Sequence, residues 1–205
     1  MNIKLYHAKH TRSLRVLWLL EEMGLRYELE VVKLALGNTG GEDFAKVNPL
    51  QKVPAISVDG EVLQESTAIL EFLANKFAAK NLLITTDHSD YGRFLQWLHG
   101  GESGFGMYLS IYFGNTVLLP ENQRSKAMAL WAEENLTKML KLFSESLAQR
   151  KYIAGDRFTI SDISVGYILY GISLLGKQEK MAPENVQNWW QLISERPAFQ
   201  KALSA

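Results

Sequence analysis

The stretch at 48–66, NPLQKVPAISVDGEVLQES, constrains the fold more than any other part of the chain. Apolar and β-branched residues fill 53–58, Asp59-Gly60 is a strong signal for a two-residue hairpin turn, and 61–63 supplies the return strand. Glu65 and Ser66 then precede an apolar helical pattern, so they fall at or near a helix N-terminus. The stretch predicts a turn, a β-hairpin and a helix in direct succession.

Pro54 decides how the hairpin begins. Proline has no N–H to donate to a sheet, so it belongs at the first position or the edge of a strand. Only about 5–6% of X–Pro bonds in folded proteins are cis, and Pro54 taken alone is expected to be trans. In a cis bond, the Val53 backbone N–H and C=O would turn outward, free to pair with another molecule.

The neighbourhood of Pro54 reverses that expectation. KVPAI, the Asp-Gly hairpin, and Glu-Ser at a helix start about ten residues after KVPAI together resemble the glutathione-binding segment of the glutathione S-transferase family. The resemblance implies that the Val53-Pro54 bond is cis.

The rest of residues 1–79 fits a thioredoxin-like α/β domain. Strands are predicted at 3–7 and 27–32, with a helix opening at 11–13 and ending near Gly24. A flexible loop is expected at 36–41, one or two helical turns at 42–47, and a helix at 65–77 after the hairpin. The order is β-α-β-α-β-β-α, and the β-α-β part is a parallel crossover unit.

Residues 88–205 predict an all-α domain of about five helices, joined to the first by a linker at 80–87. The predicted helices are 89–115, bent at its glycines, then 120–150, 163–175, 183–194 and 197–203. Thr159 and Asp162 fit a capping box ahead of an apolar, buried helix. GDRFTISDI also resembles the capping segment of glutathione transferases, so both residues are interpreted as structural. The whole order resembles that of cytosolic glutathione transferases, which implies their fold.

Composition excludes several classes of function. The 205 residues are 47% hydrophobic, enough to bury a sizeable core. The 22 basic and 22 acidic side chains balance, which argues against nucleic acid or an anionic membrane as partner. No apolar run approaches the roughly 20 residues of a membrane helix, and no signal peptide is evident, so a cytoplasmic location is expected. With no cysteine, disulfides and a cysteine nucleophile are excluded. The four histidines are His7, His10, His88 and His99. No metal is expected, because their spacing is not that of metal ligands.

The start of the first helix carries the predicted chemistry. A free thiol has a pKa of about 8.5, and a helix N-terminus together with a hydroxyl donor can stabilise its thiolate. HTRSLRVLWLLEE resembles NSRSxRxLWLLEE of bacterial and fungal family members, whose active-site serine falls on Thr11 here. Thr11 is therefore the predicted hydrogen-bond donor to the thiolate, with Ser13 as the substitute. The alternative, that either hydroxyl only caps the helix, stays open. Tyr6 is interpreted as core or wall.

The resemblance also implies a glutathione-binding set. Val53 would pair through its backbone with the cysteinyl moiety, Glu65 with the α-amino group, and Ser66 with the γ-glutamyl carboxylate. Lys52 is a candidate for the glycyl carboxylate, and a solvated turn lysine is the open alternative. The remaining members of the predicted set are Arg12, Gln51, Pro54 and Glu102. Glu102 lies in WLHGGES, which resembles a stretch that approaches glutathione of the partner subunit, and this implies a homodimer.

An electrophile pocket is expected between the domains. Its predicted walls are Phe105, Met107, Tyr108 and Tyr112, for which a place in the helical core is the alternative. The leading hypothesis is a detoxifying glutathione S-transferase that activates glutathione as a thiolate for conjugation to a small hydrophobic electrophile, with peroxide reduction as a variant. The alternatives are a non-catalytic ligand-binding or protein-interaction scaffold, and a glutathione-dependent isomerase or dehalogenase.

Overall fold

The computed structural model describes residues 2–35 and 38–205, which form two compact units. The first unit is Met1–Lys80 together with Glu195–Ala205, and the second is Asn81–Ser194. Each unit is described by itself. Residues 36 and 37 of the predicted loop lie outside the described residues.

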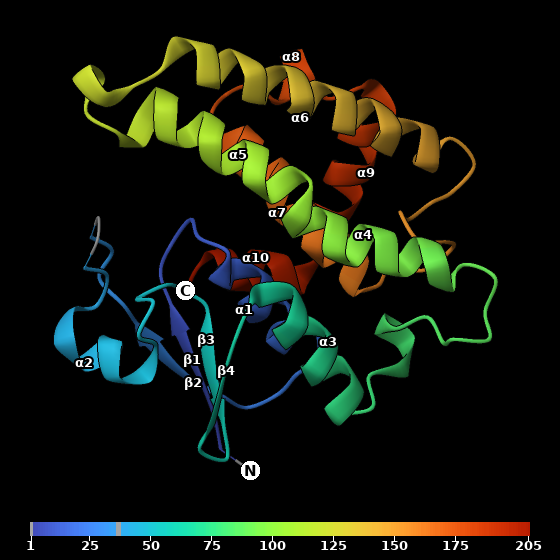
Figure 1. Cartoon of the computed structure of the whole chain (residues 1–205). Helices are drawn as coiled ribbons and strands as arrows, with labels where there is room; N and C mark the ends of the chain where they lie inside the picture. Colours follow the sequence, from blue (N-terminus) through green and yellow to red (C-terminus); the bar gives the residue numbers. More distant parts are fainter. Residues whose placement is uncertain (1, 36–37) are drawn as a thin grey trace. The chain divides into compact units, whose positions relative to one another are not determined.

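The first unit is built on a four-stranded mixed sheet (Figure 1). Its order is β2-β1-β3-β4, with β1 parallel to β2 and antiparallel to β3, and β3 antiparallel to β4. The predicted thioredoxin-like order is confirmed. The elements are β1 Ile3–His7, α1 Ser13–Glu22, β2 Glu28–Val31, α2 Gly41–Val47, β3 Ala55–Val58, β4 Glu61–Gln64, α3 Ser66–Lys76 and α10 Pro197–Leu203.

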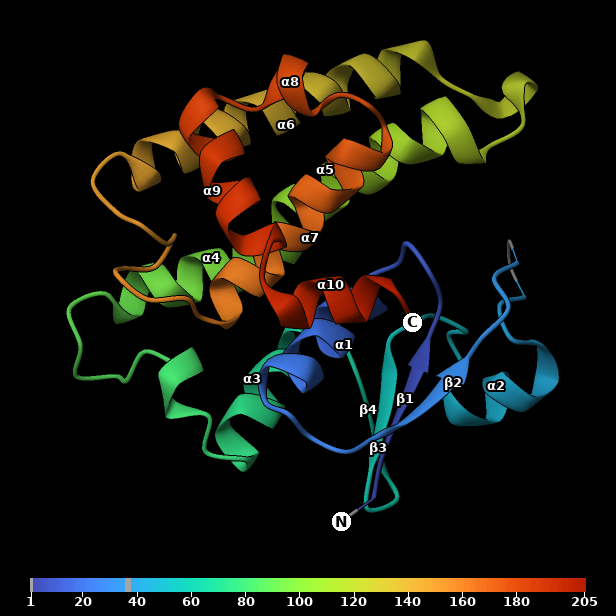
Figure 2. The same ribbon diagram turned by 180° about the vertical axis from the view of Figure 1, so that it is seen from behind.

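Helices cover both faces of this sheet. In both views α2 lies on one side of the strands, and α1, α3 and α10 lie on the other (Figures 1 and 2). Tyr6 and Ala55 are opposite each other in the sheet and form a small core with Phe44 of α2. Side chains alternate along a strand, so the next pair, Leu5 and Ile56, faces the other way, and both are fully buried.

Helix α10 is fastened to α1 although 174 residues separate the partners in its main ion pair. The Trp18 and Phe199 rings lie 4.6 Å apart between centroids. Arg196 makes a two-pronged bond with the Glu22 carboxylate, at 2.6 Å from Nε and 2.7 Å from Nη2. Such forked pairs are stronger and more directional than single contacts, so α10 is an integral layer of the first unit.

The second unit is helical throughout its regular structure. The described elements are α4 Tyr91–Ser103, α5 Phe105–Phe113, α6 Lys126–Leu147, α7 Ile160–Leu174, α8 Gln178–Met181 and α9 Glu184–Ser194, with short 3₁₀ helices at Lys80–Leu82 and Glu121–Gln123 and a π-helix at Gly114–Leu118. The helix predicted at 89–115 is two helices, because the chain breaks at Gly104. The prediction missed the short α8 altogether.

The predicted start of the 120–150 helix is wrong. α6 begins at Lys126, where Ser125 is the N-cap and its hydroxyl accepts from the Met128 N–H at 3.2 Å. The Arg124 side chain donates to the carbonyls of Leu119 (2.7 Å) and Val117 (2.9 Å). These contacts hold the preceding segment in an irregular turn, so the helix cannot extend back to Pro120.

Helices α4 and α7 pack closely in the centre of the second unit. Ser161 and Ser164 of α7 each donate a hydrogen bond of 2.7 Å to a carbonyl of α4, those of Phe94 and Leu98. A Cβ at Gly101 would lie 2.2 Å from the Ser164 Oγ, so only glycine permits this approach. The predicted burial of α7 is confirmed, since 12 of its residues from Ile160 to Ile172 are buried.

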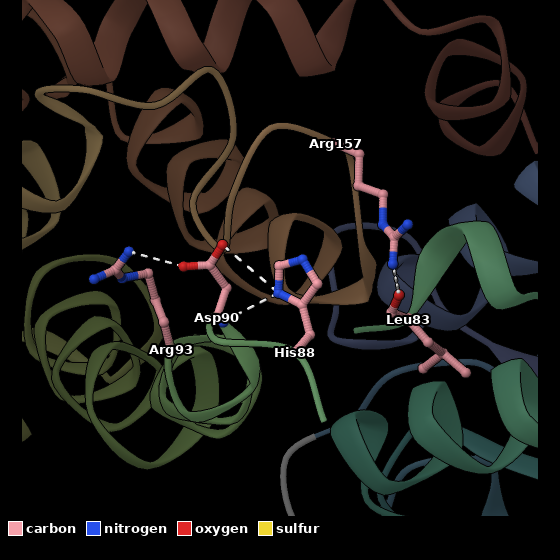
Figure 3. Close-up of polar contacts among 5 residues, drawn as sticks. All are labelled: Leu83, His88, Asp90, Arg93 and Arg157. Atoms are coloured by element: carbon pink, nitrogen blue, oxygen red, sulfur yellow. Dashed lines mark hydrogen bonds and ion pairs between the residues drawn. The ribbon is translucent and has the colours of Figure 1, made fainter. Parts of the chain in front are cut away.

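Polar contacts fix the segment that leads into α4 (Figure 3). The Asp90 N–H donates to His88 Nδ1 at 3.1 Å, and the Asp90 carboxylate accepts from Arg93 at 3.4 Å. Further back, the Leu83 carbonyl accepts from Arg157 Nη2 at 2.6 Å. Side chains from outside the segment therefore order part of the predicted linker. Of the helices in the described residues, none carries an apolar stretch long enough to cross a membrane.

Candidate functional site

Strand register brings three distant segments to one end of the first unit's sheet. Tyr6 near the end of β1 is opposite Ala55 at the start of β3, and Ala55 is opposite Gln64 at the end of β4. The turn after β1, the segment before β3 and the start of α3 therefore leave the sheet at the same edge. These segments contain the predicted residues at 11–13, 51–54 and 65–66.

The turn after β1 holds a cluster of hydroxyl groups. Thr11 Oγ1 donates to the Ala8 carbonyl at 2.7 Å and also lies 2.7 Å from Ser13 Oγ. Ser13 Oγ in turn lies 2.8 Å from His7 Nδ1. Thr11 is half-buried, whereas Ser13 and His7 are 0% and 2% exposed. Of the two predicted hydroxyls, only Thr11 is open to a ligand.

His7 is the first polar partner that the sequence did not reveal. Burial, with a smaller contribution from the positive charge of Lys9, lowers the pKa of His7 to about 4. Its imidazole is therefore neutral at pH 7. No motif singles out this histidine, because its relation to Ser13 exists only once the chain has turned after β1.

The hydroxyl of Thr11 contributes little to capping α1. The N-cap of α1 is Arg12, which makes no side-chain capping bond. The one bond of this kind from Thr11 is long, with the Ser13 N–H at 3.4 Å from Oγ1. The capping alternative thus accounts for only a weak part of the Thr11 contacts.

The segment before β3 is held by side chains of its own unit. The Val53-Pro54 peptide bond is cis, as predicted from the family resemblance. The buried Asn48 side chain donates to the Lys52 carbonyl at 2.7 Å and accepts from the Leu50 N–H at 3.0 Å. Gln51 Nε2 donates to the loop at 38–41, with 2.9 Å to Asn38 Oδ1. Lys52 itself is exposed, so its ammonium is available to an anion.

The start of α3 offers an anion-binding arrangement. Ser66 is the first residue of α3, where backbone N–H groups lack partners within the helix. Arg15, a fully buried residue of α1, donates from Nη1 to Ser66 Oγ at 3.0 Å. Its positive charge lies behind the helix start and favours a carboxylate there. Arg15 falls on an arginine of the NSRSxRxLWLLEE motif, but sequence reasoning gave it no role, because its partner Ser66 lies 51 residues away.

Three of the five non-glycine residues with positive φ in the described part of the chain lie among or beside the predicted ligand residues. His10, Gln51 and Glu65 have φ of 62°, 48° and 68°, in the region that residues other than glycine rarely adopt. Such conformations cost about 1–3 kcal/mol each and persist where the surroundings or a function enforce them. Glu65 is exposed and makes no side-chain capping bond to α3. Its carboxylate is therefore accessible to a ligand.

The other predicted residues lie in the second unit. Glu102 is half-buried, and its carboxylate lies so close to Gly106 that a Cβ there would be 2.9 Å from Oε2. Phe105 is fully buried against Trp97 and Phe143, with ring centroids 6.3 Å away in each case. The other three predicted pocket residues differ in exposure: Tyr112 is buried, Tyr108 half-buried and Met107 exposed.

Comparisons with known proteins agree with this fold. The family profile of the glutathione S-transferase N-terminal domain matches residues 1–75, and that of the C-terminal domain matches 107–197. Glutathione S-transferase F13 of Arabidopsis thaliana is 31% identical over 207 residues, covering 98% of this chain and 94% of that protein. Glutathione S-transferase 3 of Zea mays is 30% identical over 195 residues, with 93% and 88% covered.

A solved structure shows the same likeness in three dimensions. A sphingomonad glutathione S-transferase complexed with glutathione has a TM-score of 0.84 and 30% identity, covering 98% of this chain and 97% of that one. The thioredoxin-like unit and the all-helical unit contain the two matched transferase domains. The chain belongs to the glutathione S-transferase family.

Proposed function

We propose that this transferase binds glutathione at the sheet end formed by the turn after β1, the segment before β3 and the start of α3. It activates the glutathione thiol as a thiolate for attack on a small hydrophobic electrophile. The observation that carries the proposal is the register of β1, β3 and β4, which gathers three separately predicted segments at one edge. The sphingomonad relative, whose structure is complexed with glutathione, supports the choice of ligand.

Each segment has a role that its chemistry suits. The Val53 backbone adds the cysteinyl moiety of glutathione as an extra strand. The start of α3, with Ser66 and the charge of Arg15 behind it, binds the γ-glutamyl carboxylate. The exposed Glu65 carboxylate pairs with the α-amino group, and Lys52 pairs with the glycyl carboxylate. Arg12, Gln51 and Pro54 complete the proposed site.

Thr11 is the proposed donor to the thiolate. Lowering a thiol pKa by about two units requires about 2.7 kcal/mol of preference for the anion, at about 1.36 kcal/mol per unit. A hydrogen bond to a charged group contributes about 1.5–3 kcal/mol, and a helix N-terminus about 0.3–1 kcal/mol. The half-buried Thr11 hydroxyl at the start of α1 can supply most of this. Ser13 is fully buried, so it is not the donor we propose.

The electrophile and the assembly complete the proposal. Met107 and Tyr108, as the more exposed of the four predicted residues, are the proposed walls for the electrophile, with Phe105 and Tyr112 behind them. Glu102 is proposed to act in a homodimer, toward glutathione of the partner subunit. The location proposed is cytoplasmic, with peroxide reduction as a second use of the same thiolate.

An ultraviolet titration of bound glutathione thiolate against pH tests this function. We expect a depressed thiol pKa in the wild type and a rise of about one unit or more in Thr11→Ala, with glutathione still bound. In the contrasting variant, Ser66→Ala, glutathione affinity falls about tenfold or more, while the thiolate donor is intact. A wild type that binds glutathione without a depressed pKa would favour a non-catalytic binding protein. An unchanged pKa in Thr11→Ala would remove Thr11 from the mechanism.

A further inference from the structure

Behind Thr11 lies a chain of short hydrogen bonds that the proposed mechanism does not use. It runs from the Ala8 carbonyl to Thr11 Oγ1 (2.7 Å), then to Ser13 Oγ (2.7 Å), and ends at His7 Nδ1 (2.8 Å). The two inner groups, Ser13 and His7, are buried and cannot touch a ligand. Any effect of Ser13 and His7 on a bound ligand must therefore act through Thr11.

The donors and acceptors along this chain have only one arrangement that makes all three short contacts. A carbonyl cannot donate, so the single Thr11 proton points to Ala8 O. The contact between the hydroxyls must then use the Ser13 proton, which Ser13 donates to Thr11. Ser13 therefore has no proton left for His7, and the His7 contact requires a proton on Nδ1. The geometry assigns the Nδ1–H tautomer to His7.

Two backbone groups use the remaining lone pairs. The Ala8 N–H lies 3.2 Å from Ser13 Oγ, and the Ser13 N–H lies 3.4 Å from Thr11 Oγ1. A hydroxyl oxygen accepts two hydrogen bonds and donates one. Ser13 accepts from His7 and Ala8, and Thr11 accepts from both donors of Ser13. With its acceptor capacity occupied, Thr11 can serve a ligand only as a donor.

A group that only donates discriminates between the two forms of a thiol. A thiolate accepts hydrogen bonds strongly, whereas a neutral thiol is a weak acceptor and brings a proton that needs an acceptor of its own. Thr11 can donate its proton to the thiolate, but it has no free lone pair to accept the proton of the neutral thiol. Resting on the proposed function, we propose that His7 is a positioning residue whose Nδ1–H, acting through Ser13, keeps Thr11 as a donor to the glutathione thiolate.

The proton balance of this step is simple. The glutathione thiol loses its proton to solvent, and no bond to the protein forms or breaks. The Thr11 hydroxyl turns its proton from the Ala8 carbonyl toward the sulfur, and Ser13 continues to donate to Thr11. His7 keeps its proton throughout, because burial and the charge of Lys9 hold the imidazole neutral at pH 7.

Substitution of His7 tests the inference. In His7→Leu one lone pair of Ser13 Oγ becomes free, so Ser13 can donate to the Ala8 carbonyl, 3.2 Å away, and accept from Thr11, whose own lone pair is then open to the proton of a thiol. We expect the thiolate-to-thiol ratio of bound glutathione to fall about threefold to tenfold, a rise of about 0.5–1 unit in its pKa. Glutathione affinity measured well below that pKa stays within about twofold, because no binding group is changed.

Three variants separate positioning from a structural effect. His7→Asn can present an amide N–H near the imidazole Nδ1 and should restore the wild-type thiol pKa. Ser13→Ala interrupts the same chain, so adding His7→Leu to it should raise the pKa no further. His88→Leu removes a histidine of the second unit and should leave the pKa unchanged. If His7→Leu fails to fold, Ser13→Ala and His7→Asn still carry the test.

The outcomes distinguish this inference from the function on which it rests. A wild type without a depressed thiol pKa overturns the proposed function itself. A depressed pKa that rises in Thr11→Ala but not in His7→Leu or Ser13→Ala overturns only the role of His7. Additive effects of His7→Leu and Ser13→Ala overturn it as well, because they place His7 outside the chain.

Discussion

Two helices of this protein begin with the same local pattern, Thr-x-Ser, and use it differently. At α1 the residues are Thr11 to Leu14, and at α7 they are Thr159 to Asp162. In both, the threonine Oγ1 accepts from the N–H two residues on, at 3.4 Å and 3.3 Å. In both, the threonine carbonyl accepts from the N–H three residues on, at 3.0 Å. These hydrogen bonds match, although α1 begins at Ser13, two residues after its threonine, and α7 begins at Ile160, one residue after its threonine.

The difference lies in where the threonine proton goes. At α7 the Thr159 hydroxyl and N–H both donate to the Asp162 carboxylate, at 3.1 Å and 2.9 Å, and the site is fully buried. At α1 the residue in the position of Asp162 is Leu14, and the half-buried Thr11 hydroxyl donates to the Ala8 carbonyl. One proton is committed to a carboxylate inside the fold, and the other can be redirected to a ligand. The residue three positions after the threonine, Asp162 in α7 and Leu14 in α1, is the local difference between the two helix starts.

The largest effect is expected from removing that carboxylate. Asp162 also accepts from the Ile153 N–H (3.0 Å) and from Trp189 Nε1 (3.1 Å). Asp162→Ala leaves these buried donors and those of Thr159 without an acceptor, so the free energy of unfolding should fall by about 3–5 kcal/mol. Chemical denaturation measures it. The exposed Asp156→Ala is the control and should change stability by less than about 0.5 kcal/mol. Equal losses would refute a special role for Asp162.

A second effect sharpens the comparison through pH. Burial raises the pKa of Asp162 to about 6 from 3.8, against the opposing influence of its hydrogen bonds. The folded chain therefore binds this proton more tightly than the unfolded chain. The stabilisation is complete below pH 3.8 and is lost as pH rises through about 6, in total about 3 kcal/mol. The difference in the free energy of unfolding between wild type and Asp162→Asn, measured by denaturation at a series of pH values, should fall by this amount over this pH range. A difference that does not change with pH would contradict the prediction.

The smallest effect compares the two threonines directly. Thr159→Val removes a cap hydroxyl and should lower the free energy of unfolding by about 1–2 kcal/mol without altering the thiol pKa of bound glutathione. Thr11→Val should lower the free energy of unfolding by less than about 1 kcal/mol but raise the thiol pKa of bound glutathione. Denaturation and thiolate titration on both variants provide the measurements. If the two variants behave alike, the comparison between the helix starts fails.

Much of the fold could be predicted because its signals are local. The Asp59-Gly60 turn, the alternating strand residues and the Thr159–Asp162 box act over a few neighbours, and the structure has the hairpin and cap where they indicate. The start of α6 could not be chosen in this way. Pro120 and Ser125 are both good helix starters, and the choice depends on Arg124, which bonds carbonyls five and seven residues earlier.

The same distinction between local signals and long-range contacts applies to the residues of the site. The hydroxyl of Thr11, the Val53-Pro54 segment and Ser66 were proposed from motifs, and the sheet register places their three segments at one edge. His7 and Arg15 were not proposed, because they act on other side chains rather than on the ligand. Arg15 contacts a residue 51 positions away, which no local pattern encodes. Residues that support a site become visible only once tertiary structure is known.

The attachment of α10 to α1 also sets an order of events during translation. Residues 1–80 leave the ribosome first, yet the layer that covers Trp18 and pairs with Glu22 comes from Glu195–Ala205. At about 5–20 residues per second, synthesis of the intervening unit takes on the order of ten seconds. During that time the nascent first unit exposes the apolar face of α1 around Trp18 and a Glu22 carboxylate that lacks its arginine partner. A nascent chain stalled before residue 195 would carry both in every copy.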